Sequence, residues 1–259
     1  MTAAPTPGPG PAPGPGPDTG PGPDTGSRPG RDSGGDRRPA GPPPCGVAPG
    51  ESPLPGPLAA DFYRRDPRQV APDLLGKLLV RVDAAAPPRA GRIVEVEAYC
   101  GERDPGSHAY RGMTRRNRTM FGPPGGLYVY FTYGMHWCAN VVCGDEGEGL
   151  AVLLRALAPT RGLEAMRAAR PLARRDRDLC SGPAKLCQAL GLDGSFDGAD
   201  LVRADRGVWV GDDGVAPPAV PFQTTRIGLS AGGEHPWRWC VPGDPHVSGP
   251  ARLRGPLPS

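Results

Sequence analysis

The first 57 residues limit the fold most strongly, because almost nothing in them can be buried. Of the first 50 residues, 28 are Pro or Gly, and the hexapeptide PGPDTG occurs twice in tandem, at 15–20 and 21–26. A stretch with so few apolar side chains cannot offset the entropy cost of ordering. We therefore predict a disordered tail over residues 1–57 and one folded domain over residues 58–259, which is long enough for a sizeable core.

The composition also bears on location and on partners. The tail lacks the apolar segment of a secretory signal, its acidic residues are untypical of a transit peptide, and we expect no membrane contact. The seven cysteines form no CxxC motif and the four histidines are not at zinc-ligand spacing, so we expect reduced thiols and no metal. These features predict a cytoplasmic protein, associated with the nucleoid if the source is a prokaryote. A net charge of +3 permits a polyanionic partner without requiring one.

The folded part has the pattern of short strands separated by turns, with a few helices between them. Residues 92–100 alternate in hydrophobicity, and residues 127–132 are rich in aromatic and β-branched side chains, which favours strands. A turn around Gly134 predicts a protruding β-hairpin. We therefore predict a single α+β domain with a curved antiparallel β-sheet core surrounded by helices. Further strands are expected at 137–143, 150–157, 226–230 and 237–241, and helices early in 61–82, at 163–170 and at 181–192, the last capped by Ser181 and ending near Gly191.

The strand at 92–100, RIVEVEAYC, carries two carboxylates on one face. Since side chains alternate along a strand, one face holds Ile93, Glu95, Glu97 and Tyr99 and the other holds Val94, Val96 and Ala98. Charge on a face that packing would fill with apolar groups indicates either a solvated face or acid–base chemistry. Cleavage of a glycosidic bond commonly needs a carboxylate that activates water.

Aromatic and basic residues gather around the predicted hairpin. The aromatic residues are Tyr99, Tyr128, Tyr130, Tyr133 and Trp137, and the basic loop just upstream holds Arg111, Arg115, Arg116 and Arg118. An apolar wedge at a hairpin tip can enter a DNA minor groove and unstack bases, and the arginines could contact phosphates. Ordinary core packing and a solvated loop are the alternative interpretations of the two clusters.

Several segments, in order, carry a resemblance to a known family. RIVEVEAY, His108, RNRTMF, GGLYVYFTYGMHWCANV, LLRALAP and DLCSGPAKLCQALGL together resemble the alkyladenine (3-methyladenine) DNA glycosylase family, from about residue 60 to about 250. The resemblance implies a monofunctional base-excision enzyme that acts as a monomer without a cofactor. Its implied partner is double-stranded DNA with an alkylated or deaminated purine: 3-methyladenine, 7-methylguanine, hypoxanthine or ethenoadenine. The enzyme would flip this base out and hydrolyse the N-glycosidic bond, leaving an abasic site.

The resemblance also implies roles for the residues at the bond that is cleaved. Glu97 matches the glutamate that deprotonates the attacking water. Arg155 matches an arginine that helps to hold this water, and the backbone carbonyl of Ile227 matches a third contact. Glu95 has no implied mechanistic role, and we expect it to form a structural ion pair with a nearby arginine.

Further matches concern the base pocket and the DNA surface. Tyr99 and Tyr130 match walls that stack on the flipped base, and the main chain of His108 matches a hydrogen-bonding partner of its edge. Asn140 matches a residue that excludes guanine by clashing with its exocyclic amine. The expected DNA contacts are the wedge Tyr133 with Met135 beside it, and the loop arginines Arg115, Arg116 and Arg118.

Two other functions compete with this interpretation. A binding-only module for distorted DNA would need the wedge and the basic loop but not Glu97, Arg155 or Asn140. A carbohydrate glycosidase would use Glu95 and Glu97 as its two carboxylates, and their spacing on one strand face does not exclude it.

Overall fold

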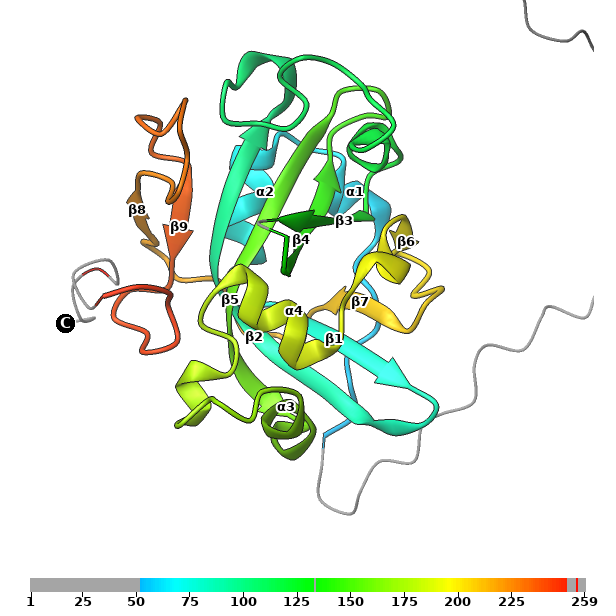
Figure 1. The fold of residues 1–259 in the computed structure, drawn as a ribbon, viewed down its shortest axis with the longest axis vertical. Coiled ribbons are helices and arrows are strands. Elements are labelled where there is room, and N and C mark those ends of the chain that lie inside the picture. The colour runs from blue at the N-terminus through cyan, green and yellow to red at the C-terminus, as the bar shows by residue number, and fades with distance from the viewer. Residues whose placement is uncertain (1–51, 133, 251–254, 256–259) are drawn as a thin grey trace, which may run out of the picture. The chain divides into compact units, whose positions relative to one another are not determined.

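An antiparallel β-sheet forms the centre of the folded part in the computed structural model, which describes residues 52–132, 134–250 and 255 (Figure 1). The strands follow the order β6-β3-β4-β5-β2-β1-β7, and β9 pairs with both β2 and β8. The pairing throughout this part is antiparallel, which confirms the predicted α+β class. The strands are β1 Leu78–Asp83, β2 Ala86–Cys100, β3 Gly126–Thr132, β4 His136–Cys143, β5 Leu150–Arg161, β6 Ala199–Asp200, β7 Val208–Gly211, β8 Phe222–Thr224 and β9 Arg238–Cys240.

Short helices pack against this sheet. The α-helices are α1 Ala60–Tyr63, α2 Pro67–Leu74, α3 Leu163–Ala169 and α4 Pro183–Leu190, and the 3₁₀-helices are Gly101–Arg103, Arg118–Phe121, Asp176–Asp178 and Gly194–Phe196. Helix α2 begins with Pro67 after the N-cap Asp66, whose side chain accepts the N–H of Arg68. Leu74 from α2 and Leu186 and Leu190 from α4 enter the main hydrophobic core. No helix in the described ranges is both long and apolar enough to cross a lipid bilayer.

Strand β2 divides its side chains between the main core and the opposite face of the sheet. Val96 and Ala98 are buried in the main core. Val94, which the alternation places with them, packs instead in a separate cluster that contains Ala156 and Cys240. The pairing of β2 with β5 shifts register on both sides of Glu95, and such irregularities re-aim side chains. Regular alternation therefore holds only from Val96 onward.

The predicted hairpin is confirmed as β3 and β4, in which Thr132 pairs with His136. Gly134 in the turn has a φ of +68°, a left-handed conformation that glycine adopts without strain. Met135 follows it and is 69% exposed. Tyr133 lies outside the described residues.

Two predicted elements differ from the structure. Residues 226–230 form no strand, because Arg226 and Ile227 direct their polar groups to Asp104 and Glu97 rather than to a neighbouring strand. The N-cap of α4 is Gly182 without a side-chain cap, while Ser181 forms a β-bridge with Ala156. The end of α4 is as predicted, with Gly191 in a left-handed conformation.

The N-terminal part of the described chain packs on strand β7. Leu58 donates its N–H to the carbonyl of Val210, and Trp209 donates its indole N–H to the carbonyl of Pro55. Pro57 also forms a bridge with Gly211. The packed chain therefore extends N-terminal to the predicted boundary at residue 58, while residues 1–51 of the predicted tail lie outside the described residues.

Candidate active site

The register of the sheet brings residues of four strands into one row. Glu97 on β2 pairs with Leu153 on β5, Leu153 pairs with Asn140 on β4, and Asn140 pairs with Tyr128 on β3. Directly paired residues of neighbouring strands point to the same face of a sheet. This row therefore lies on the face opposite the main core, which takes the alternate residues such as Val96.

Glu97 is the acid at one end of this row, and it is fully buried. Its Oε1 accepts the backbone N–H of Ile227 at 2.8 Å. Its Oε2 accepts the hydroxyl of Tyr99 at 2.9 Å and lies 3.1 Å from Nη1 of Arg155. A carboxylate offers about four acceptor positions, so these donors leave capacity for one further hydrogen bond, such as one from a water molecule.

Arg155 on β5 links the two glutamates of the predicted strand face. Its Nε donates to Oε1 of Glu95 at 2.8 Å, while its Nη1 faces Glu97. Arg155 is 7% exposed and Glu95 is not exposed at all. A single buried cation is therefore shared between two buried carboxylates, which fixes the direction in which its guanidinium points.

Both carboxylate oxygens of Glu95 accept hydrogen bonds. Its Oε1 accepts Nε of Arg155, Nε of Arg238 at 2.7 Å and the hydroxyl of Ser248 at 2.9 Å, and its Oε2 accepts the N–H of Ser248 at 2.6 Å. Burial by itself would raise the pKa of this carboxyl, but Arg155, Arg238 and the Ser248 N–H outweigh burial and hold the pKa below its usual value. The ion pair expected for Glu95 is present, and it involves two arginines.

Tyr99 donates its phenolic hydrogen to Glu97. Burial, followed by the nearby negative charge of Glu97, raises the pKa of Tyr99 far above its usual range. Tyr99 therefore remains a neutral hydrogen-bond donor at physiological pH. The face of its ring is in contact with the guanidinium of Arg226.

The second aromatic group comprises Tyr128, Tyr130 and His108. The rings of Tyr128 and Tyr130 stack at a centroid distance of 5.4 Å, and the His108 ring meets Tyr130 edge-on at 4.5 Å. Nδ1 of His108 lies 3.1 Å from the hydroxyl of Tyr128. Burial, with Arg116 nearby, lowers the pKa of His108, which favours its neutral form. The carbonyl of His108 accepts the side-chain amide of Asn117 at 2.8 Å, which holds this main chain in place.

Asn140 lies within the row and is 4% exposed. Its Nδ2 donates to the carbonyl of Tyr128 at 3.3 Å. Glu97 lies two strands away through Leu153. The predicted residues Glu97, Tyr99, Tyr130, Asn140, Arg155 and Ile227 thus converge on one face of the sheet, and His108 joins them from the loop that follows β2.

The three predicted DNA-contact arginines lie at the surface of the folded part. Arg115, Arg116 and Arg118 are exposed, and Arg116 donates to the carbonyl of Phe131 on β3 at 2.9 Å. The basic loop is therefore attached to the hairpin that carries Met135.

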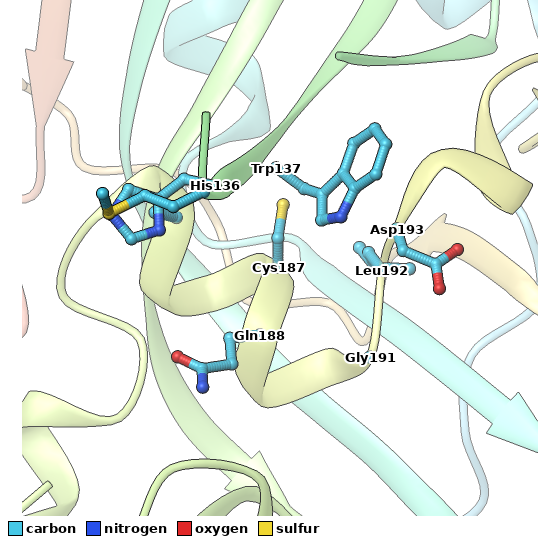
Figure 2. Close-up of a pocket in the computed structure, with 9 residues that line it drawn as sticks. His136, Trp137, Cys187, Gln188, Gly191, Leu192 and Asp193 are labelled. Carbon is cyan, nitrogen blue, oxygen red and sulfur yellow. The ribbon is translucent and has the colours of Figure 1, made fainter. Parts of the chain in front are cut away.

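A pocket of about 340 Å³ lies between β4 and α4 (Figure 2). It shares only Met135 with the predicted site, and Glu97 does not line it. Glu97 is fully buried, with the Tyr99 hydroxyl and the Ile227 N–H bound to its carboxylate. The pocket is lined by Met135, His136, Trp137, Ala184, Cys187, Gln188, Gly191, Leu192 and Asp193.

Four further polar residues, which no motif in the sequence marks, hold the site together. They are Asp104, Arg226, Arg238 and Ser248, all of which are less than 10% exposed in the folded chain. Arg238 and Ser248 contact Glu95, and Arg226 contacts Asp104. Each lies far from its partner in the chain, so no local pattern in the sequence marks them. Among the described residues, no group of His, Cys, Asp and Glu is arranged to hold a metal ion.

Comparisons with known proteins show which family the chain belongs to. A family model described as methylpurine-DNA glycosylase matches residues 61–245. The chain is 60% identical over 197 residues to a Burkholderia lata protein, covering 76% of this chain and 93% of that protein. It is 49% identical over 202 residues to a Streptomyces avermitilis protein (77% and 94% covered) and 46% identical over 191 residues to a Chlorobaculum parvum protein (74% and 90% covered). Each is named "Putative 3-methyladenine DNA glycosylase". This chain belongs to the methylpurine-DNA glycosylase family.

Proposed function

We propose that this protein excises alkylated or deaminated purines from duplex DNA by hydrolysing the N-glycosidic bond. The observation that carries the proposal is the carboxylate of Glu97, which is held by Tyr99, Arg155 and the Ile227 N–H. The names of the relatives in three bacterial genera support the same activity. The substrates are 3-methyladenine, 7-methylguanine, hypoxanthine and ethenoadenine.

In the proposed reaction, Glu97 takes a proton from a water molecule, which then attacks the sugar carbon that carries the base. The negative charge of Glu97 also balances the positive charge that develops on the sugar. Arg155 steers the water, and its own position depends on Glu95. A positively charged alkylated purine is already a good leaving group, so its departure needs little further help.

The flipped base stacks against Tyr99 and Tyr130, with its edge at the main chain of His108. Flipping a base costs a few kcal/mol, least for a damaged or mispaired base, and aromatic stacking returns about 1–3 kcal/mol per base. Glu97 has no exposed surface, so binding of the lesion must open a path to it for the sugar and the water. Met135 at the hairpin tip and Tyr133, two residues earlier in the chain, fill the gap in the duplex, and Arg115, Arg116 and Arg118 contact its phosphates.

The contacts of Glu95 argue against a carbohydrate glycosidase. Such enzymes usually place two carboxyl groups on either side of the bond that is cleaved. Both oxygens of Glu95 are already occupied by Arg155, Arg238 and Ser248, and the side chain is fully buried. Of the two glutamates, only Glu97 is therefore available as a catalytic carboxylate.

The shared arginine argues against a binding-only module. Burial of charged groups carries a large desolvation cost, and recognition of distorted DNA gains nothing from Glu97 and Arg155 at the floor of the site. Activation of a water requires the carboxylate of Glu97, and Arg155 holds this carboxylate in place.

The proposal is tested with duplexes that each contain one lesion. We expect the purified protein to release free 3-methyladenine and to leave abasic sites that alkali cleaves. An undamaged duplex of the same sequence is the control. Binding to the lesion duplexes without release of any base would instead support the binding module.

Asn140 offers a test of substrate selection. We propose that its buried side chain excludes guanine, whose exocyclic amine would clash with it. Asn140→Ser should therefore raise excision of guanine from G·T mispairs by about tenfold, which corresponds to about 1.4 kcal/mol, while 3-methyladenine release is largely retained. The measurement is single-turnover release of guanine. An unchanged rate, in a variant that is folded and active on 3-methyladenine, would remove Asn140 from this role.

A further inference from the structure

Arg226 is a buried arginine near the candidate acid Glu97. It directly precedes Ile227 in the chain. Its guanidinium lies 4.8 Å from the centroid of the Tyr99 ring and 5.0 Å from that of the Trp237 ring. The two terminal nitrogens of the guanidinium donate to the carboxylate of Asp104. Nη1 lies 2.5 Å from Oδ2, and Nη2 lies 2.7 Å from Oδ1. Both side chains are fully buried. This two-pronged, stacked geometry is one that arginine provides and lysine does not.

The same two side chains also tie several backbone segments together. Arg226 Nη1 donates to the carbonyl of Ala98 at 3.0 Å, and Nη2 donates to that of Gly232 at 2.6 Å. Asp104 accepts the N–H of Cys100 at 3.1 Å and that of Gly106 at 2.9 Å. The end of β2, the loop that leads to His108, and the loop that contains Ile227 are thereby fixed to one buried ion pair.

Two glycines leave space for the guanidinium. A Cβ at Gly106 would lie 2.9 Å from Nη2 of Arg226, and one at Gly232 would lie 3.0 Å from it. Gly232 also has a φ of +65°, where other residues are strained. The surrounding backbone is therefore shaped closely around this one side chain.

We propose that Arg226 and Asp104 form a positioning pair for the hydrolytic step. The pair supports the Tyr99 ring from its side and, because Arg226 precedes Ile227, it sets the direction of the N–H that Ile227 donates to Glu97. Glu97 is thereby held where it can direct a water. This inference rests on the proposed glycosylase function.

Stability alone is a weak reason for such a pair. Replacing a buried ion pair with apolar residues of similar volume is often neutral or stabilising. The pair is placed against Tyr99 and next to Ile227, which are two of the three residues that bind Glu97. Small misplacements of groups in an active site are costly, since about 1 Å can reduce a rate about 100-fold.

The test compares Arg226→Lys with Arg92→Lys. Arg92 makes the same two-pronged contact with Asp213, at 3.0 and 2.8 Å. It also donates to the carbonyl of Gly76, and it lies away from the predicted site residues. Single-turnover release of 3-methyladenine and the Kd for the lesion duplex are measured for both variants and the wild type. We expect Arg226→Lys to slow release by about 10- to 100-fold with little change in Kd, and Arg92→Lys to match the wild type.

A second variant, Asp104→Asn, keeps the proposal testable if Arg226→Lys fails to fold. It keeps Arg226, and it should also slow release of 3-methyladenine while the Kd for the lesion duplex is retained. Equal slowing in Arg226→Lys and Arg92→Lys, or slowing that weaker DNA binding explains in full, would overturn the proposal. So would failure of both site variants to fold while Arg92→Lys folds, because the pair would then serve stability alone. A wild-type protein that releases no base would instead refute the proposed function.

Discussion

Glu97→Gln should abolish base release while the protein still binds lesion-containing DNA. Glutamine has the size of glutamate but cannot take a proton from water, so the general-base contribution of about 10²- to 10⁴-fold is lost. The charge that balances the developing positive sugar is lost as well. The drop in the single-turnover rate should therefore reach at least the upper part of that range.

The contacts of Glu97 also predict that Glu97→Gln loses some stability, which must be separated from its loss of activity. Ile227 N–H and the Tyr99 hydroxyl donate to different oxygens of the carboxylate. A glutamine amide presents an NH₂ group to one of them, which removes one hydrogen bond and costs about 1–3 kcal/mol. Unfolding must therefore be measured beside activity, so that release is compared between folded samples.

Glu102→Gln is the matched control for this experiment. Glu102 is exposed and lies a short distance beyond β2, so the same chemical change there should leave release unaltered. Release by Glu97→Gln at the wild-type rate would show that another group activates the water. Loss of lesion binding together with release would assign Glu97 to recognition instead.

Glu95→Gln should cause a large loss of stability, and this is the second major effect that we expect. The substitution leaves Arg155 and Arg238 buried beside a neutral amide. Removing one partner of a buried ion pair commonly destabilises a protein by about 3–5 kcal/mol. The free energy of unfolding, measured with urea at neutral pH, should fall by about this amount.

The contribution of Glu95 to stability should also depend on pH. The pKa of Glu95 is lower in the folded chain than its ordinary value of 4.5, so its contribution to stability is complete above that ordinary value. The contribution is lost as the pH falls from there through the folded pKa. The difference in unfolding free energy between wild type and Glu95→Gln should therefore be constant near neutrality and shrink below about pH 4.5.

Asp213→Asn serves as the control for stability. Asp213 pairs with Arg92, but both side chains are partly exposed, and exposed pairs contribute about 1 kcal/mol or less. A loss in Glu95→Gln no larger than the loss in Asp213→Asn would mean that the buried network around Glu95 contributes little to stability.

The sequence alone identified the α+β class, the hairpin and the strand that carries the acid. These features depend on local rules. Alternation along a strand puts Glu97 and Tyr99 on one face, and the structure joins them by a hydrogen bond of 2.9 Å. A turn that needs a left-handed residue marks Gly134. Such signals lie within a few residues of one another, so one chain is enough to detect them.

The tertiary structure alone decided which residues bind Glu95. Strand alternation presents Glu95 and Glu97 as two equivalent carboxylates on one face, and only the resemblance to a known family separated their roles. Arg238 on β9 and Ser248 beyond it reach Glu95 across 143 and 153 residues of chain and occupy its oxygens, while Glu97 keeps an acceptor position. Arg226 reaches Asp104 over 122 residues in the same way. Partners so distant leave no periodic pattern, because strand pairing and loop packing bring them together only after the sheet has formed.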